Sequence, residues 1–142
     1  MHELAFLSLC KLDLKKLDRR YVMIEMEGKP FRVRVLVYGG DTNNKKTLCM
    51  THGWLGNSTG WTWMLKPLAE HYRLVLFDCA SWGLNTKLDK SVALESPEAA
   101  EVWLREWSVK LFDAMTDQGM VPDKFYLAGH SVGGWLAAQY AS

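Results

Sequence analysis

The sequence predicts an α/β fold in which an antiparallel hairpin precedes parallel strands with flanking helices. Residues 21–27 have an extended pattern that ends at a Gly-Lys-Pro break, and in residues 31–37 Phe31 and three valines alternate with Arg32, Arg34 and Leu36. This period of two across the break is typical of a hairpin with one wetter face. Further along, three short runs are apolar without interruption, as strands buried on both faces of a parallel sheet are. These runs are residues 48–50, 74–77 and 125–128. Helix-forming segments between the runs complete the α/β pattern.

Three segments are predicted to be helical. Residues 61–71 form the first, and Pro67 is expected to kink or break it. Residues 97–118 form the second: Ser96 is a good N-cap residue, and Gly119 stops the helix. Its expected core stripe has helical spacing and consists of Ala100, Leu104, Trp107, Leu111 and Met115. Residues 131–142 form the third.

Length and charge allow one small domain and exclude several classes of protein. The chain has 142 residues and a formal net charge of +1, so no strong field favours nucleic acid as a partner. No apolar run is long enough to cross a membrane, and the amino terminus lacks the positive region of a secretory signal. The three cysteines, Cys10, Cys49 and Cys79, have no metal-like spacing and are expected to be reduced. These features predict a cytoplasmic protein.

The first twenty residues are predicted to be an amino-terminal flank of the domain, which then covers residues 21–142. Apolar side chains at Leu4, Leu7, Leu14 and Leu17 lie among an excess of basic residues. The favoured interpretation is the solvated flank of a surface element. The alternative is an amphipathic segment that makes peripheral contact with an anionic membrane.

The sequence Gly129-His130-Ser131-Val132-Gly133 fits the pattern G-x-S-x-G. It follows a predicted buried strand and opens a predicted helix, which is the context in which that pattern presents a nucleophilic serine. On such a sharp turn the hydroxyl of Ser131 is lifted off the sheet, and Gly129 and Gly133 avoid a collision of side chains. The helix that follows directs unpaired N–H groups toward the same place. We therefore predict that Ser131 is a catalytic nucleophile.

Two other interpretations of this turn are weaker. A dinucleotide-binding loop, G-x-G-x-x-G, would need glycine where Ser131 stands. A coincidental glycine-rich turn would not be expected to have a second matching motif upstream.

That second motif is Thr51-His52-Gly53-Trp54, which follows the apolar run 48–50. Gly53 lets the backbone turn so that the N–H of Trp54 can point at a developing negative charge, and Val132 would supply the second N–H. Trp54 and Val132 are thus the predicted oxyanion donors. His52 is expected to hold this loop by hydrogen bonding, and His130, beside the serine, to contribute to the shape of the turn.

Three features, in this order along the chain, resemble the α/β-hydrolase superfamily, especially its esterase and lipase-like members. They are the His52-Gly53 loop, Asp78 after the next strand and the Gly-His-Ser-Val-Gly-Gly turn at 129–134. The resemblance implies the α/β-hydrolase fold and no cofactor or metal. One departure is the glycine-rich stretch D-x-x-G-x-G-x-S of the family. Here it is Asp78-Cys79-Ala80-Ser81-Trp82-Gly83-Leu84-Asn85, in which only the second glycine is kept.

The second departure concerns the catalytic triad, whose acid and histidine follow the serine in this superfamily. Only eleven residues follow Ser131, and none is Asp, Glu or His. The histidines that are present, and Asp78, are not expected to reach the hydroxyl as its base. We therefore expect the chain to be the amino-terminal part of the fold, ending in the helix after the nucleophile without the carboxy-terminal strands, and to be inactive by itself.

The function predicted for the full-length protein is that of a serine hydrolase acting on a small ester or lipid. Trp54, Trp61, Trp63 and Trp82 could line an apolar mouth for such a substrate, although helical packing explains Trp61 and Trp63 equally well. A non-catalytic or regulatory relative and an acyltransferase remain alternatives. A nucleotide-binding domain is disfavoured by Ser131.

Overall fold

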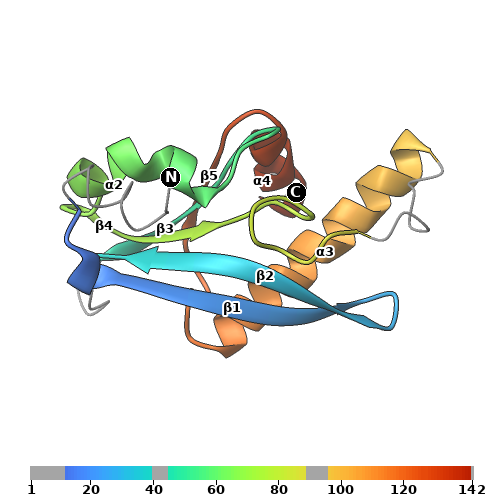
Figure 1. Cartoon of the computed structure of the whole chain (residues 1–142), viewed down its shortest axis with the longest axis horizontal. Helices are drawn as coiled ribbons and strands as arrows, with labels where there is room; N and C mark the ends of the chain where they lie inside the picture. The colour runs from blue at the N-terminus through green and yellow to red at the C-terminus, as the bar shows by residue number, and fades with distance from the viewer. Residues whose placement is uncertain (1–11, 40–44, 89–95, 142) are drawn as a thin grey trace.

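The computed structural model describes residues 12–39, 45–88 and 96–141. They form a five-stranded sheet in the order β1-β2-β4-β3-β5, with helices on both faces (Figure 1). The strands are β1 (Leu17–Met26), β2 (Lys29–Tyr38), β3 (Lys46–Thr51), β4 (Tyr72–Phe77) and β5 (Tyr126–Gly129). The helices are α2 (Thr62–Leu68), α3 (Pro97–Asp117) and α4 (Val132–Ala141), with short 3₁₀ turns η1 (Leu14–Lys16) and η2 (Ser58–Trp61).

The pairing of the strands is that of the predicted α/β fold. β3 pairs in parallel with β4 on one side and with β5 on the other, whereas β2 joins β4 in the antiparallel sense. The parallel strands β3 and β5 therefore end at the same edge of the sheet, and the residues that follow them meet there. This edge carries both sequence motifs.

The β1–β2 hairpin is longer than predicted and turns more tightly. β1 begins at Leu17, so the last part of the predicted flank of residues 1–20 belongs to the sheet. The exposed charged side chains of this outer strand hide the two-residue period that would identify it as a strand. The loop has two residues, Glu27 and Gly28, both with positive φ as a type I′ turn requires. The predicted break was thus wrong in including Lys29 and Pro30, which lie in β2.

The expected wet face of the hairpin is present in β1 but absent from most of β2. Tyr21 and Met23 of β1 are exposed, whereas β2 is buried from Val33 onward, including Arg34. The reason is the place of β2 between two strands, with a hydrophobic cluster on each face of the sheet. One cluster holds Val75 and Phe77 of β4, and the other holds Leu74 and Leu76, which explains the uninterrupted apolar run.

The helices divide between these two clusters. α3 and α4 pack on one face, and α2 packs on the other through Leu65. α3 crosses the hairpin (Figure 1), and its cap is as predicted: the Ser96 hydroxyl accepts a hydrogen bond from the N–H of Ala99. At the start of the predicted stripe, Ala100 is only partly buried and is not part of the core, whereas Leu104 is partly buried and packs against it. Trp107, Leu111 and Met115 of the stripe are buried as predicted, and the structure adds Trp103, Ser108 and Phe112 to the buried face.

The first predicted helix is shorter than expected. α2 begins at Thr62 and ends at Leu68, directly after Pro67, and Trp61 belongs to the separate 3₁₀ turn η2. Leu12, within the predicted flank, is buried against the same cluster as α2. Leu12 and, in part, Leu17 therefore pack on the domain, whereas Leu4, Leu7 and Cys10 lie outside the described residues.

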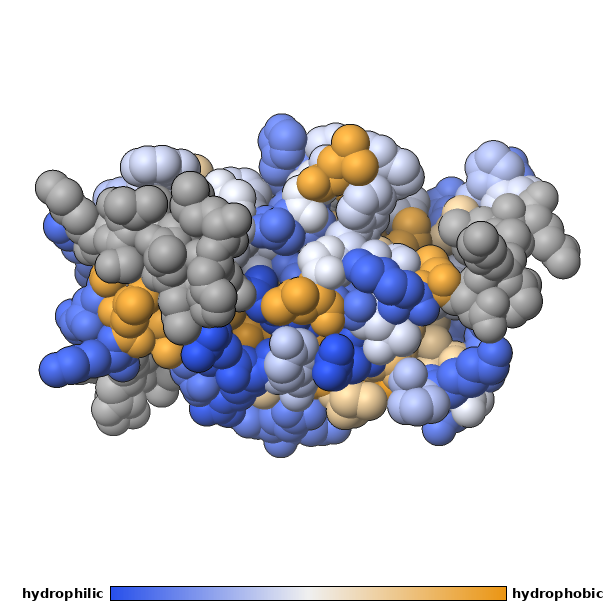
Figure 2. Space-filling view, viewed as in Figure 1, coloured by the Kyte–Doolittle hydropathy of each residue, from blue (hydrophilic) through white to orange (hydrophobic). Residues whose placement is uncertain are grey.

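The surface is mixed in character. On the face shown in Figure 2, hydrophobic side chains form separate patches among hydrophilic ones. Among the helices that the structure describes, none is long and apolar enough to cross a membrane.

Candidate active site

Ser131 lies on the turn between β5 and α4, at the end of the sheet where the parallel strands finish. Its φ is 54°, a left-handed conformation that non-glycine residues seldom adopt, and its side chain is exposed. Val132 is the first residue of α4, so its N–H is among those that have no partner within the helix. A strained turn thus presents the hydroxyl at a helix N-terminus.

Backbone contacts explain the glycines of this turn. A Cβ at Gly129 would overlap the carbonyl group of Gly133 and would lie 2.5 Å from the nitrogen of Gly134. A Cβ at Gly133 would lie 2.5 Å from the carbonyl oxygen of His52 and 2.8 Å from that of Thr51. The strand, the helix and the upstream loop therefore approach one another more closely than any side chain permits.

The loop that follows β3 lies against the turn. At Gly53 a Cβ would lie 3.0 Å from Cβ of Ser131 and 2.6 Å from Nδ1 of His130, so a side chain there would displace the His130 ring. His130 itself is exposed. The structure thus brings together His52, Gly53, Gly129, His130, Ser131 and Gly133, which are six of the eight predicted site residues, and Trp54 and Val132 are their chain neighbours.

His52 is buried, and both nitrogens of its ring are occupied. Nε2 accepts a hydrogen bond from the N–H of Cys79 at 2.9 Å, so the ring proton is on Nδ1, which donates to the carbonyl oxygen of Gly53 at 2.8 Å. A histidine held in this way has no free nitrogen with which to take a proton from Ser131. It belongs to the framework of the loop.

These hydrogen bonds orient the peptide group between Gly53 and Trp54. The carbonyl oxygen of Gly53 accepts from the His52 ring and, at 3.1 Å, from the N–H of Gly56. Because a trans peptide is planar, the N–H of Trp54 points opposite to this carbonyl, away from the His52 ring. The direction of that N–H is therefore fixed by the loop itself.

A cavity of about 330 Å³ opens beside this loop. Its lining includes His52, Gly53, Trp54, Asn57, Trp61 and His130. Of the four tryptophans expected at the mouth, Trp54 and Trp61 line this cavity, and Trp82 packs edge-on against Trp54 with ring centroids 4.8 Å apart. Trp63 is exposed on α2 and is not among the lining residues.

Asp78 is completely buried and serves as an anchor for two loops. Its carboxylate accepts hydrogen bonds from the N–H groups of Ser58 (2.6 Å) and Leu84 (3.0 Å), and it lies 3.7 Å from the guanidinium of Arg34. Burial lowers the pKa of Arg34, and the neighbouring carboxylate opposes this shift. With its oxygens held in this way, Asp78 is not placed to act as a base.

Asn85 and Ser81 account for the altered glycine-rich stretch. The Asn85 amide donates to the carbonyl oxygens of Asp78 (2.8 Å) and Cys79 (2.9 Å) and accepts from the N–H of Arg34 at 2.7 Å. Ser81 has a φ of 64°, and thus takes the left-handed conformation where the pattern has glycine. A Cβ at Gly83 would overlap the Asp78 carboxylate, which explains why this glycine is kept.

The anchoring role of Asp78 leads to a prediction on stability. Asp78→Asn keeps the shape of the side chain but removes the charge that faces the buried Arg34, so it is expected to lower the free energy of unfolding by about 3 kcal/mol. The exposed Asp123 provides the control, and Asp123→Asn is expected to change it by less than about 0.5 kcal/mol. Urea unfolding of both variants measures the difference. Equal stabilities would contradict the anchoring role.

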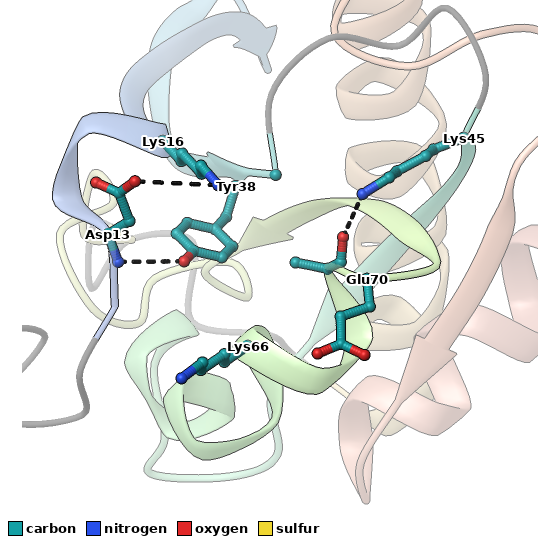
Figure 3. Close-up of a pocket in the computed structure, with 8 residues that line it drawn as sticks. Asp13, Lys16, Tyr38, Lys45, Lys66 and Glu70 are labelled. Atoms are coloured by element: carbon teal, nitrogen blue, oxygen red, sulfur yellow. Dashed lines mark hydrogen bonds and ion pairs between the residues drawn. The ribbon is translucent and has the colours of Figure 1, made fainter.

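A second pocket, of about 320 Å³, lies at the opposite end of the parallel strands (Figure 3). Figure 3 shows Lys16 beside Asp13, and Lys45 donating to the main-chain carbonyl of Ala69. Lys66 and Glu70 of the α2 region complete the charged lining, so cations and carboxylates are mixed around it. Ser131 follows β5 at the other end of the sheet, so this pocket is separate from the candidate site.

In the described part of the chain, no group of three or more His, Cys, Asp or Glu side chains could hold a metal ion.

Comparison with known proteins identifies the family. The family model described as "Alpha/beta hydrolase family" matches residues 50–142, which include both motifs and the whole segment between them. The chain belongs to the alpha/beta hydrolase family. A probable 1-acylglycerol-3-phosphate O-acyltransferase of Oryza sativa subsp. japonica is 32% identical over 103 residues, which are 69% of this chain and 22% of the rice protein.

Other relatives of this alpha/beta hydrolase have different activities. A pimeloyl-[acyl-carrier protein] methyl ester esterase of Aeromonas salmonicida is 33% identical over 94 residues, 66% of this chain and 31% of the esterase. The crystal structure of a bacterial membrane phospholipase A superposes with a TM-score of 0.69 at 23% identity, over 97% of this chain and 39% of that one, and shows the same fold. The chain spans between a fifth and a third of the length of the two curated relatives.

Proposed function

We propose that the full-length protein is a serine hydrolase of carboxylic esters, with Ser131 as its nucleophile. The observation that carries this proposal is the position of Ser131, exposed on a left-handed turn at the start of α4 and against the His52-Gly53 loop. The alpha/beta hydrolase family, and the esterase among the relatives, support the reaction type.

The reaction follows from the groups around this turn. The Ser131 hydroxyl attacks the ester carbonyl carbon and gives its proton to a base, forming a tetrahedral oxyanion. The N–H groups of Trp54 and Val132 stabilise that oxyanion, and the alcohol then leaves with a proton from the conjugate acid of the base. Water attacks the acyl-enzyme in the same manner, and the carboxylic acid is released. No step requires a cofactor.

We propose no residue of this chain as the base or as the acid that orients it. His52 has both ring nitrogens engaged, Asp78 is buried among its own partners, and no Asp, Glu or His follows Ser131. The 142-residue chain expressed alone is therefore expected to show no turnover of p-nitrophenyl esters above the rate in buffer. Turnover by this chain that Ser131→Ala removes would contradict the assignment of the base to other parts of the protein.

The proposed substrate is a small ester or a lipid whose acyl part enters the cavity beside Trp54. The size of this cavity, about 330 Å³, and the two tryptophans in its lining suit a short apolar chain. We propose a cytoplasmic protein, and peripheral contact with a membrane is the alternative.

An acyltransferase is the second candidate, since the rice relative is named as one and the same nucleophile could transfer its acyl group to an alcohol instead of water. Product analysis with the full-length protein distinguishes the two. An ester donor is supplied with and without 1-acylglycerol-3-phosphate as acceptor. Free carboxylic acid as the main product in both mixtures supports the hydrolase, and a diacyl product as the main one in the second mixture overturns it.

A further inference from the structure

The thiol of Cys79 lies directly beneath the loop that carries the Trp54 N–H. Cys79 follows Asp78 after β4, and it is only 3% exposed. Its Sγ lies 2.9 Å from Oγ1 of Thr51 and 3.2 Å from the carbonyl oxygen of His52, while its main-chain N–H donates to Nε2 of the same histidine. One residue therefore holds His52 at both its ring and its carbonyl group.

The protons in this cluster have one consistent arrangement. A carbonyl oxygen only accepts, so the Cys79 S–H donates to His52, and the Thr51 hydroxyl then donates to the sulfur. Burial raises the pKa of the Cys79 thiol to about 11, which keeps this donor protonated at neutral pH. A second chain of hydrogen bonds runs from the Cys79 N–H through the His52 ring to the Gly53 carbonyl, and the first of these bonds polarises the other.

The far end of this chain is the peptide that carries the Trp54 N–H. The His52 ring fixes the Gly53 carbonyl, and the planar peptide fixes the N–H opposite to it. The His52 carbonyl, which the thiol holds, also lies against Gly133, where a Cβ would be only 2.5 Å away. A shift of His52 would therefore displace both the loop and the turn that carries Ser131.

We propose that Cys79 is a positioning residue of the active site, whose thiol holds the His52 carbonyl and thereby the direction of the Trp54 N–H. This inference rests on the proposed function for its effect on catalysis. It adds a residue that neither the serine turn nor the His-Gly loop contains. Without the thiol, the His52 carbonyl loses its donor, and the Thr51 hydroxyl loses its acceptor.

Three variants of the full-length protein test this role. Cys79→Ala removes the thiol but keeps the main-chain N–H, and Cys79→Ser restores a donor and an acceptor. Cys49→Ala is the matched control, because Cys49 is equally buried in the same hydrophobic cluster and lies two residues before Thr51 on β3. Both alanine variants leave a cavity of one sulfur atom, so loss of packing alone would affect them alike.

Two measurements separate positioning from packing. We expect Cys79→Ala to lower the rate constant for reaction of Ser131 with a fluorophosphonate about tenfold, since complete loss of one oxyanion donor costs about 10²- to 10³-fold. The amide hydrogens of residues 53–56 should also exchange several-fold faster. Cys79→Ser should recover most of both values, and Cys49→Ala should change neither, although it lowers the melting temperature.

Equal labelling rates and equal amide exchange in Cys79→Ala and Cys49→Ala would overturn the proposal. If wild-type protein is not labelled at Ser131 at all, the proposed function fails. The amide exchange still decides the role of Cys79 in that case, because exchange in the loop does not depend on catalysis: faster exchange in Cys79→Ala alone supports it, and unchanged exchange overturns it.

Discussion

Ser131→Ala in the full-length protein is expected to lower kcat for p-nitrophenyl ester hydrolysis by about 10⁴-fold or more. Removing the nucleophile of a serine hydrolase removes the acyl-enzyme route and leaves only binding and oxyanion stabilisation. Ser131 is exposed, and alanine deletes a single oxygen, so the fold should be unchanged. Steady-state kinetics measures the rate, and circular dichroism checks the fold.

Ser96→Ala is the control for this variant. It removes the N-cap of α3, which belongs to neither motif, and is expected to cost about 1 kcal/mol of stability with no change in kcat. Ser96→Ala is thus expected to lose stability without losing activity, and Ser131→Ala to lose activity without losing stability. A Ser131→Ala protein that keeps activity within tenfold of wild type would show that another group is the nucleophile.

Gly129→Ala is expected to destabilise the domain by about 3 kcal/mol or more, because the added methyl group would overlap the backbone of Gly133 and the nitrogen of Gly134. Backbone atoms on both sides cannot move aside as a flexible side chain could. To relieve the overlap, β5 and α4 must separate, and the turn that carries Ser131 must change. The free energy of unfolding in urea measures the effect.

Gly60→Ala is the matched control, since a Cβ there meets nothing within 4 Å and the backbone is not left-handed. It is expected to be neutral to within about 0.5 kcal/mol. If Gly129→Ala is as stable as Gly60→Ala, the close packing of β5 against α4 is wrong.

The part of the site that the sequence predicts best is the part made of glycines. Gly129, Gly133 and Gly53 each stand where a Cβ would lie 3.0 Å or less from neighbouring atoms. Because this close approach favours glycine, the position can be recognised from the residue type alone. The short motifs are therefore visible without a structure. So are the apolar runs of β3 and β4, because both faces of these strands are covered.

The residues that hold the two loops could not be found in this way. Cys79, Asn85 and Arg34 act through hydrogen bonds across long stretches of chain, and several other residue types could make similar bonds. The only available signal was the place of Asn85, where the family's glycine-rich pattern ends in serine. Arg34 was expected on a wet face, because an isolated strand does not reveal that Asp78 will be buried beside it.

The predicted boundaries and buried faces of the elements were wrong where the local sequence pattern was weak. The charged residues 18–20 hide the start of β1, since an outer strand tolerates charge on its exposed side. In α3, the expected stripe omitted Trp103, which is buried because it packs edge-on against Phe31 with ring centroids 5.9 Å apart. Such contacts depend on which strands lie beneath the helix.

The most direct test of the assignment of Ser131 is to identify the residue that a fluorophosphonate modifies. The full-length protein is treated with the probe, digested and analysed by peptide mass spectrometry. We predict a single adduct on Ser131, with none formed after heat denaturation. Ester hydrolysis that the probe inhibits through an adduct at another residue, with Ser131 unmodified, would contradict the account.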